Sequence, residues 1–130
     1  YASISGFGQT GPYSKRGGVD QIAQGMGGLK SITGEPGRGP MRVGIPINDL
    51  TAGNLLAFAI MLALYEREKT GEGRYVHTSL LEAEVFMLDF QASRYLMDGE
   101  VAGQAMGGGF LAHGLLRSAP LRVKRVSSSA

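Results

Sequence analysis

The sequence has 130 residues, the size of one ordinary domain, and its 43% hydrophobic and 18% charged residues are typical of a folded protein and not of a disordered one. It contains no cysteine, which excludes disulfides and thiolate chemistry. The formal net charge of +2 comes from residues 101–130, which contain four basic residues and no acid, whereas all 11 acidic residues precede them. The main body therefore gives no electrostatic support for nucleic-acid binding.

The first half of the chain predicts one strand, a loop and a short helix. Tyr1–Phe7 is partly β-branched and bounded by glycine, as in a strand. Gly8–Gly18 contains Gly-Pro and Gly-Gly pairs, which predict a loop. Val19–Met26 has apolar residues at helical spacing, and Gly27–Gly44 is expected to be irregular because of its Pro/Gly cluster.

The strongest predicted element is a helix over Asp49–Thr70, followed by Gly71 as a stop. Both of its faces are apolar for three turns, so we expect a long buried helix that other structure encloses. Its uninterrupted apolar run, residues 55–65, is shorter than the about 20 residues that a membrane span needs. We therefore expect no membrane partner.

The second half predicts a strand over Arg74–Leu80 and a helix over Leu81–Met97 that ends before Gly99. Together with the elements before it, this gives the order strand, helix, strand, helix. The fold class predicted is α/β, with a parallel βαβ unit across the helix that begins at Asp49.

The segment Gly6-Phe7-Gly8-Gln9-Thr10-Gly11 matches the glycine spacing of a dinucleotide-binding fingerprint. That fingerprint functions because a helix begins there and directs its amides at a pyrophosphate. Pro12 and the Gly17-Gly18 pair follow instead. We therefore expect a loop and no nucleotide site of this type.

Asp49 has two interpretations. Aspartate is a common helix N-cap, where it stabilises the helix by about 1 kcal/mol. A carboxylate at a helix N-terminus is also kept ionised by the helix dipole and nearby amides, so it can act as a nucleophile. The position alone favours the cap.

Other chemistry-bearing residues are few. His77 falls on a predicted strand and His113 in the unusual tail, so neither is expected to be a catalytic base. No His, Asp or Glu pair has a recognised metal spacing, and no metal is expected. The Lys15-Arg16 pair could meet a phosphate, although basic residues in a loop are usually only solvated.

Four segments in order resemble family III CoA-transferases, the group that includes formyl-CoA transferase and the carnitine CoA-transferases. They are Tyr1–Tyr13 (YASISGFGQTGPY), Ile32–Pro36 (ITGEP), Val43–Gly53 (VGIPINDLTAG) and Thr70–Val76 (TGEGRYV). The resemblance covers about residues 1–104 and implies part of the Rossmann-like large domain of such an enzyme.

The resemblance also implies the chemistry. The position of Asp49 is that of the family's nucleophile, which attacks an acyl-CoA thioester and later carries coenzyme A as an aspartyl-CoA thioester. The segment that lines the CoA site in relatives corresponds to five residues here: Arg16, Gly17, Gly18, Val19 and Asp20. Acyl-CoA and a small carboxylic acid would be the substrates, with no permanently bound cofactor, in a cytoplasmic homodimer.

Two alternatives stay open. The related α-methylacyl-CoA racemases need a histidine before the Asp of this segment, but Val19 stands before Asp20, which favours acyl transfer. The chain could also be an inactive fragment, because the family's chains are much longer and the first residue is not Met. Residues 105–130 lack the family's expected turns, and we interpret them as an atypical tail, frameshifted or disordered.

Overall fold

The protein is described by a computed structural model over residues 1–104, so the predicted tail at residues 105–130, with His113, lies outside the described residues. The elements are, in chain order, β1 (Ala2–Ser5), α1 (Asp20–Met26), α2 (Leu29–Ile32), α3 (Ile47–Thr70), β2 (Val76–Ser79), α4 (Leu80–Leu88) and α5 (Phe90–Asp98). Helix α2 lies in the stretch that was predicted to be irregular.

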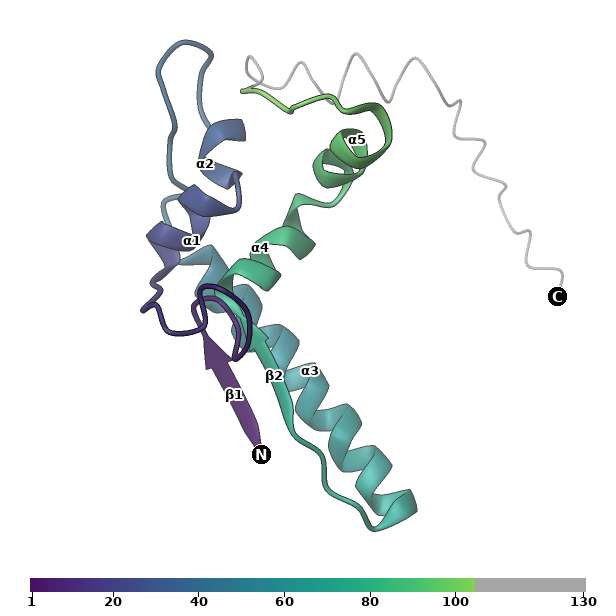
Figure 1. The fold of residues 1–130 in the computed structure, drawn as a ribbon. Coiled ribbons are helices and arrows are strands. Elements are labelled where there is room, and N and C mark those ends of the chain that lie inside the picture. Colours follow the sequence, from purple (N-terminus) through teal and green to yellow (C-terminus); the bar gives the residue numbers. More distant parts are fainter. Residues whose placement is uncertain (105–130) are drawn as a thin grey trace, which may run out of the picture.

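The two strands form a parallel pair, with Ala2 opposite Val76 and Ser5 opposite Ser79. The chain between them contains α1, α2 and α3, and α3 packs beside both strands, as Figure 1 shows. The predicted α/β class and the parallel βαβ unit are therefore confirmed. Both strands are shorter than the sequence suggested, with four residues each.

The ends of α3 differ in how well the sequence predicted them. Gly71 ends the helix as expected, with φ at 76° and its N–H donating to the carbonyl of Arg67 over 2.8 Å. The start lies two residues earlier than predicted, because Pro46 is the residue before the first helical turn. Asp49 is thus inside the first turn and is not the N-cap.

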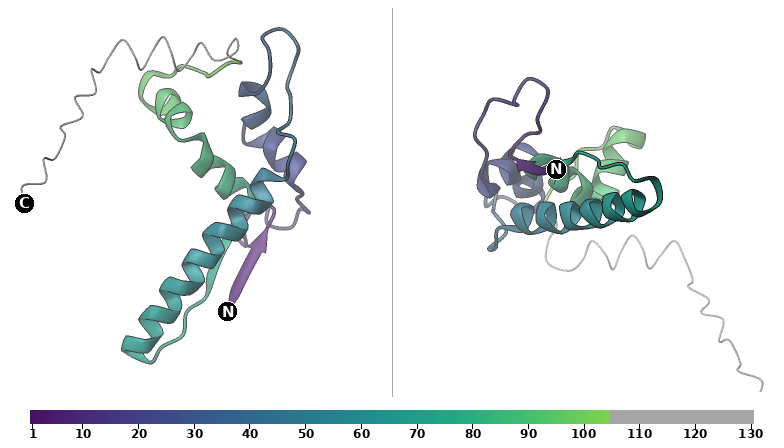
Figure 2. Two further views of the ribbon diagram at one scale, coloured as in Figure 1. Left: turned by 180° about the vertical axis from the view of Figure 1, so that it is seen from behind. Right: turned by 90° about the horizontal axis from the view of Figure 1, so that it is seen from below.

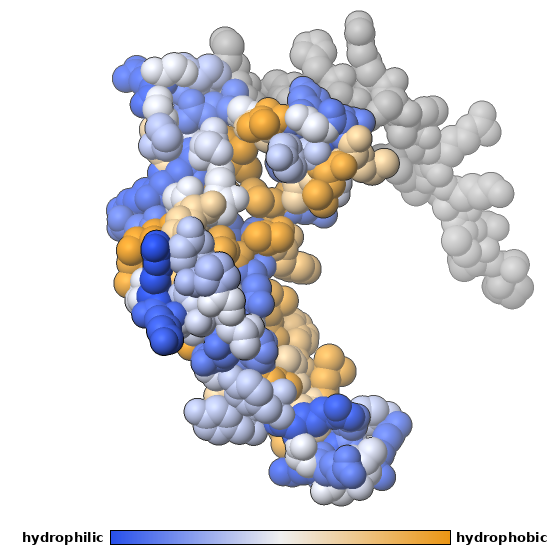
Figure 3. All heavy atoms as spheres, in the orientation of Figure 1, coloured by the Kyte–Doolittle hydropathy of each residue, from blue (hydrophilic) through white to orange (hydrophobic). Residues whose placement is uncertain are grey.

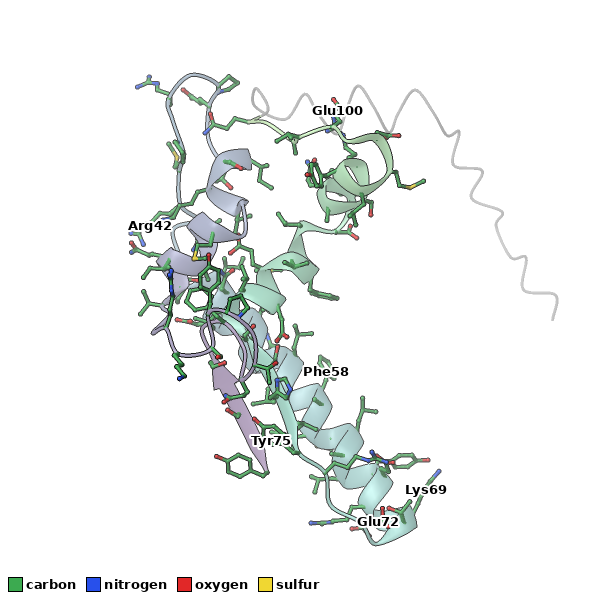
Figure 4. All side chains as sticks on the ribbon, in the orientation of Figure 1. Arg42, Phe58, Lys69, Glu72, Tyr75 and Glu100 are labelled. Carbon is green, nitrogen blue, oxygen red and sulfur yellow. The ribbon has the colours of Figure 1, made fainter. Side chains whose placement is uncertain are left out.

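The expectation that α3 is buried is wrong for the described part of the chain. Asn48 and Ala52 are its buried residues, whereas Phe58 is 70% exposed and Leu62 is 68% exposed. The reason is that two short strands and α4 cover one side of the helix, and among residues 1–104 no further layer covers the other. Apolar side chains accordingly appear on the surface along α3 in Figure 3, and Phe58 projects outward in Figure 4.

Helix α3 is long and apolar enough to cross a membrane. Length and composition are weak evidence for a span, since the core helix of a soluble protein meets the same criteria.

The last predicted helix is divided in two. Asp89 has φ at 44°, in the left-handed region that an Asp adopts far less readily than glycine, and this residue separates α4 from α5. Ser79 caps α4 by accepting a hydrogen bond from the N–H of Glu82 over 3.1 Å.

Figure 2 shows α4 and α5 on one side of the molecule and α1 and α2 on the other.

The apolar core lies where α1, α3 and α4 meet. It consists of four small or medium side chains: Ala23, Ala52, Leu80 and Ala83. Because three of them are alanine, the helix backbones approach closely, and the polar side chains next to them are also shielded from water.

Candidate active site

A network of polar side chains is buried beside the alanine core. Its members come from three helices and are 7% exposed or less: Asp20, Gln24, Asn48 and Glu84. Buried polar groups of this kind are costly unless they are hydrogen-bonded, so their contacts define the local geometry.

Asp20 and Gln24 fix the segment that leads into α3. One carboxylate oxygen of Asp20 accepts from the backbone N–H of Asn48 over 2.9 Å, and the other accepts from the Gln24 side-chain amide over 2.7 Å. The Gln24 carbonyl oxygen accepts from the N–H of Val43 over 2.9 Å. Helix α1 therefore holds this segment at two points, near its beginning and at the first turn of α3.

Glu84 holds the same turn from the other side. Its carboxylate accepts from the N–H of Leu29 over 2.9 Å and from the side-chain amide of Asn48 over 2.6 Å. Burial away from water raises the pKa of Glu84, and the negative charge of Asp20 adds to the rise, while the two hydrogen bonds oppose it. The turn that carries Asp49 is thus held by α1 and α4 together.

Asp49 itself is not part of this network. Its side chain is exposed, and within residues 1–104 its carboxylate has no hydrogen bond or ion pair. The N-cap interpretation is therefore wrong. A carboxylate in the first turn of a helix is still stabilised as an anion by the helix dipole, and here it is free to meet a ligand.

Asp49 lies at a surface hollow of about 370 Å³ between α1 and the segment before α3. The hollow is lined by Val19, Asp20, Gln21, Ile22, Arg42, Gly44, Pro46 and Asp49. Its volume falls in the range of small-ligand sites. Val19 and Asp20, two of the residues assigned to CoA binding from the sequence, are thus brought together with Asp49.

The other three residues of that assignment lie elsewhere. Arg16, Gly17 and Gly18 do not line the hollow; the guanidinium of Arg16 stands 4.4 Å above the ring of Tyr13. Gly18 packs against Gly6 so closely that a Cβ on Gly18 would lie 2.5 Å from the Gly6 Cα. This contact closes the loop between them.

The structure of that loop also shows whether the glycine motif at residues 6–11 is a dinucleotide-binding fingerprint. Gly8 and Gly11 have φ near 90°, and turns follow up to Arg16 before α1 begins at Asp20. No helix begins at the motif, so the expected loop is confirmed and the dinucleotide fingerprint is rejected. In the described part of the chain no cluster of His, Cys, Asp or Glu could hold a metal ion.

Arg42 is a residue of the hollow that sequence reasoning missed. It lies in the Pro/Gly-rich stretch before α3, where no periodicity distinguishes one residue from another. The one feature of the sequence that could have pointed to Arg42 is its positive charge seven positions before Asp49. Figure 4 shows Arg42 at the outer edge of the molecule, beside α1.

Comparison with known proteins places this arrangement in a family. The sequence profile described as CoA-transferase family III matches residues 1–119. The chain belongs to this family. It is 43% identical over 99 residues to succinate–glutarate CoA-transferase of Agrobacterium fabrum, and this alignment covers 76% of this chain and 25% of that protein. It is 37% identical over 98 residues to succinyl-CoA–D-citramalate CoA-transferase of Chloroflexus aurantiacus, which covers 75% and 24%.

The fold agrees with this family III membership. A crystal structure of a CAIB/BAIF family protein from Brucella suis superimposes with a TM-score of 0.78 at 40% identity, covering 80% of this chain and 28% of that one. The family III chain described here thus spans about a quarter of the length of the curated relatives that it matches.

Proposed function

We propose that the protein is an acyl-CoA:carboxylate CoA-transferase in which Asp49 is the nucleophile. The observation that carries the proposal is the exposed Asp49 carboxylate, free of partners within residues 1–104 and held in the first turn of α3 at a ligand-sized hollow. The named relatives act on succinate, glutarate or citramalate compounds. The acid substrate proposed here is accordingly a small dicarboxylic acid.

The reaction would proceed in four exchanges. An oxygen of Asp49 attacks the thioester carbonyl, the C–S bond breaks, and a mixed anhydride and the CoA thiolate result. The thiolate attacks the Asp49 carbonyl, which releases the first acid and leaves an aspartyl-CoA thioester. A carboxylate of the second acid attacks that thioester, its C–S bond breaks, and a new mixed anhydride and the CoA thiolate result. The thiolate then attacks the acyl carbonyl of this anhydride and releases the carboxylate of Asp49. The products are the new acyl-CoA and a restored Asp49, with no net proton change.

The local structure supports this role for Asp49. Each attack creates an oxyanion close to the start of α3, where backbone N–H groups point outward and the helix dipole favours negative charge. Asp20 and Glu84 hold that turn through Asn48, so the nucleophile would not have to be ordered when the substrate binds.

The wider assignments belong to the same proposal. The chain would be part of a Rossmann-like large domain in a cytoplasmic homodimer. Coenzyme A would enter as a thioester substrate and not as a resident cofactor. Arg16, Gly17 and Gly18 would contact it on the loop beside the hollow, while Val19 and Asp20 would form the hollow's wall.

The racemase alternative is not favoured by the described residues. Such an enzyme needs a second proton-transfer group opposite Asp49, and Val19 lies in the hollow where a histidine would be required. His77 lies on β2, stacked at 5.3 Å on the ring of Tyr75, and does not line the hollow.

The test traps the proposed intermediate. The full-length natural protein is incubated with succinyl-CoA, quenched with hydroxylamine, digested and analysed by mass spectrometry. A hydroxamate on the peptide that contains Asp49, absent in the Asp49→Asn variant, is the expected result. Acyl transfer that continues in Asp49→Asn without any Asp49 adduct would overturn the assignment.

A further inference from the structure

Arg42 differs from the other arginines of the described chain in having no internal partner. Four of them form ion pairs with glutamate, namely Arg38, Arg67, Arg74 and Arg94. Arg16 lies over the ring of Tyr13. Within residues 1–104, Arg42 has neither kind of contact, although it shares the hollow with Asp49.

The backbone on both sides of Arg42 is nevertheless fixed. The N–H of Met41 donates to the carbonyl of Lys30 over 3.0 Å, and the N–H of Val43 donates to the side chain of Gln24 over 2.9 Å. A guanidinium on an anchored backbone loses less entropy when it binds a ligand than one on a mobile loop.

The anchors of Arg42 and of Asp49 are also joined to each other. Gln24 holds Val43, Asp20 holds Asn48, and the two side chains bond across one turn of α1 over 2.7 Å. One pair of buried side chains therefore sets the backbone positions next to the free cation and next to the free carboxylate. Such coupling is expected if the spacing between Arg42 and Asp49 matters.

The positive charge of Arg42 indicates which class of ligand the hollow would bind. Arg42 is the one cation among the residues of the described chain that line the hollow, and the fork of a guanidinium matches a carboxylate in a bidentate contact. A dicarboxylic acid has one carboxylate that reacts and a second that does not. The second can pair with a cation that is held near the nucleophile, and this contact is possible only for an acid that has two carboxylates.

We propose that Arg42 binds the non-reacting carboxylate of a dicarboxylic acid substrate while the other carboxylate reacts at Asp49. The inference rests on the proposed transferase function and extends it to the origin of substrate choice. Arg42 would raise the affinity for dicarboxylic acids without taking part in the bond changes at Asp49.

The experiment compares two acceptors of equal chain length in the full-length natural protein. Glutarate has the second carboxylate and pentanoate lacks it, and both are assayed with one saturating succinyl-CoA donor. The quantity measured is the ratio of kcat/KM for glutarate to kcat/KM for pentanoate. Because both acids are assayed with the same donor, any effect of a substitution on the reaction with the donor cancels in this ratio. We expect Arg42→Gln to lower this ratio about 30-fold, chiefly through the KM for glutarate, and Arg42→Lys to lower it less.

Arg38→Gln is the matched control, because Arg38 lies in the same segment but pairs with Glu35 outside the hollow. It should leave the ratio unchanged. If Arg42→Gln has the same ratio as the unsubstituted enzyme, the inference is overturned and the transferase proposal stands. The same conclusion follows if the unsubstituted enzyme shows no preference for glutarate. Absence of transfer to either acid would overturn both. Arg42→Gln should keep the melting temperature, since no internal ion pair is lost.

Discussion

The carboxylate of Asp20 accepts a hydrogen bond of 2.9 Å from the backbone N–H of Asn48, the residue directly before the proposed nucleophile. An aspartate that is 28 positions away in sequence thereby satisfies one of the open amides at the start of α3, in place of a local N-cap side chain. The position of Asp49 depends on α1 through this contact.

This dependence can be tested by exchanging the two bonded groups. Asp20→Asn should destabilise the fold by about 1–3 kcal/mol, because its new amide faces the amide of Gln24 and a buried donor loses its acceptor. The double variant Asp20→Asn/Gln24→Glu restores the donor–acceptor pair between positions 20 and 24, although it loses the 3.4 Å bond from Gln24 to the carbonyl of Ile45, and it should recover part of the loss. Urea unfolding of the four proteins measures the coupling. Additive effects of the two substitutions would contradict the assigned contacts.

A second prediction concerns the contact between Gly6 and Gly18. A Cβ on Gly18 would lie 2.5 Å from the Gly6 Cα, so Gly18→Ala has to displace backbone and should cost about 1–3 kcal/mol. Gly17→Ala is the neighbouring control, since a Cβ there meets nothing within 4 Å. Thermal unfolding followed by circular dichroism compares the two, and equal melting temperatures would contradict the close approach.

Glu84 leads to a prediction about pH. Its pKa in the folded protein is raised above the ordinary value of 4.5, mainly by burial, so the folded state binds a proton more readily than the unfolded state. The contribution of Glu84 to stability is therefore largest below the unfolded pKa and decreases as the pH rises through the folded pKa. Glu84→Gln removes this titration.

We expect the melting temperature of the unsubstituted protein, relative to Glu84→Gln, to fall as the pH rises from about 4 to about 7. Glu82→Gln serves as the control, because Glu82 is exposed on the same helix. Parallel pH profiles for the unsubstituted protein and Glu84→Gln would show that the burial of Glu84 does not influence its titration.

The exposed face of α3 gives a fourth prediction. Phe58, Leu62 and Tyr65 follow the i, i+4, i+7 spacing and are each more than 60% exposed. A continuous apolar stripe of this kind favours association, so the isolated 130-residue chain should self-associate. Replacing the three residues with Gln should reduce the association seen by sedimentation velocity, whereas Met97→Gln, on the exposed surface of α5, should not. A monomeric unsubstituted chain would contradict this.

The sequence predicted those features that depend on local chemistry. Gly71 ends α3 because a left-handed residue is needed there, and the alternation of strand and helix predicted the parallel pair. The break at Asp89 escaped prediction because the sequence has neither glycine nor proline there, the residues that usually mark such a break.

For the candidate site, the family resemblance led to the proposal of Asp49, while its surroundings required the structure. Residue type alone does not show that Asp20 and Glu84 face inward, or that Arg42 lacks a partner. These properties arise from contacts such as that between Glu84 and Leu29, which are 55 positions apart in the chain. The exposure of α3 also could not be foreseen, because its periodicity shows that a face is apolar and not what covers it.

The parallel pairing of β1 with β2 has a consequence for synthesis on the ribosome. The backbone N–H of Val76 donates to the carbonyl of Tyr1, 75 positions earlier, and every pair of opposite residues in the two strands is separated by a similar number of positions. During translation β1 emerges before α3 and β2, so it cannot pair with β2 until all of α3 and then β2 have been made. Long-range pairing of this kind is slow and leaves a bare strand edge exposed to other chains. The edge of β1 that pairs with β2 is therefore open to other chains during the interval before β2 appears.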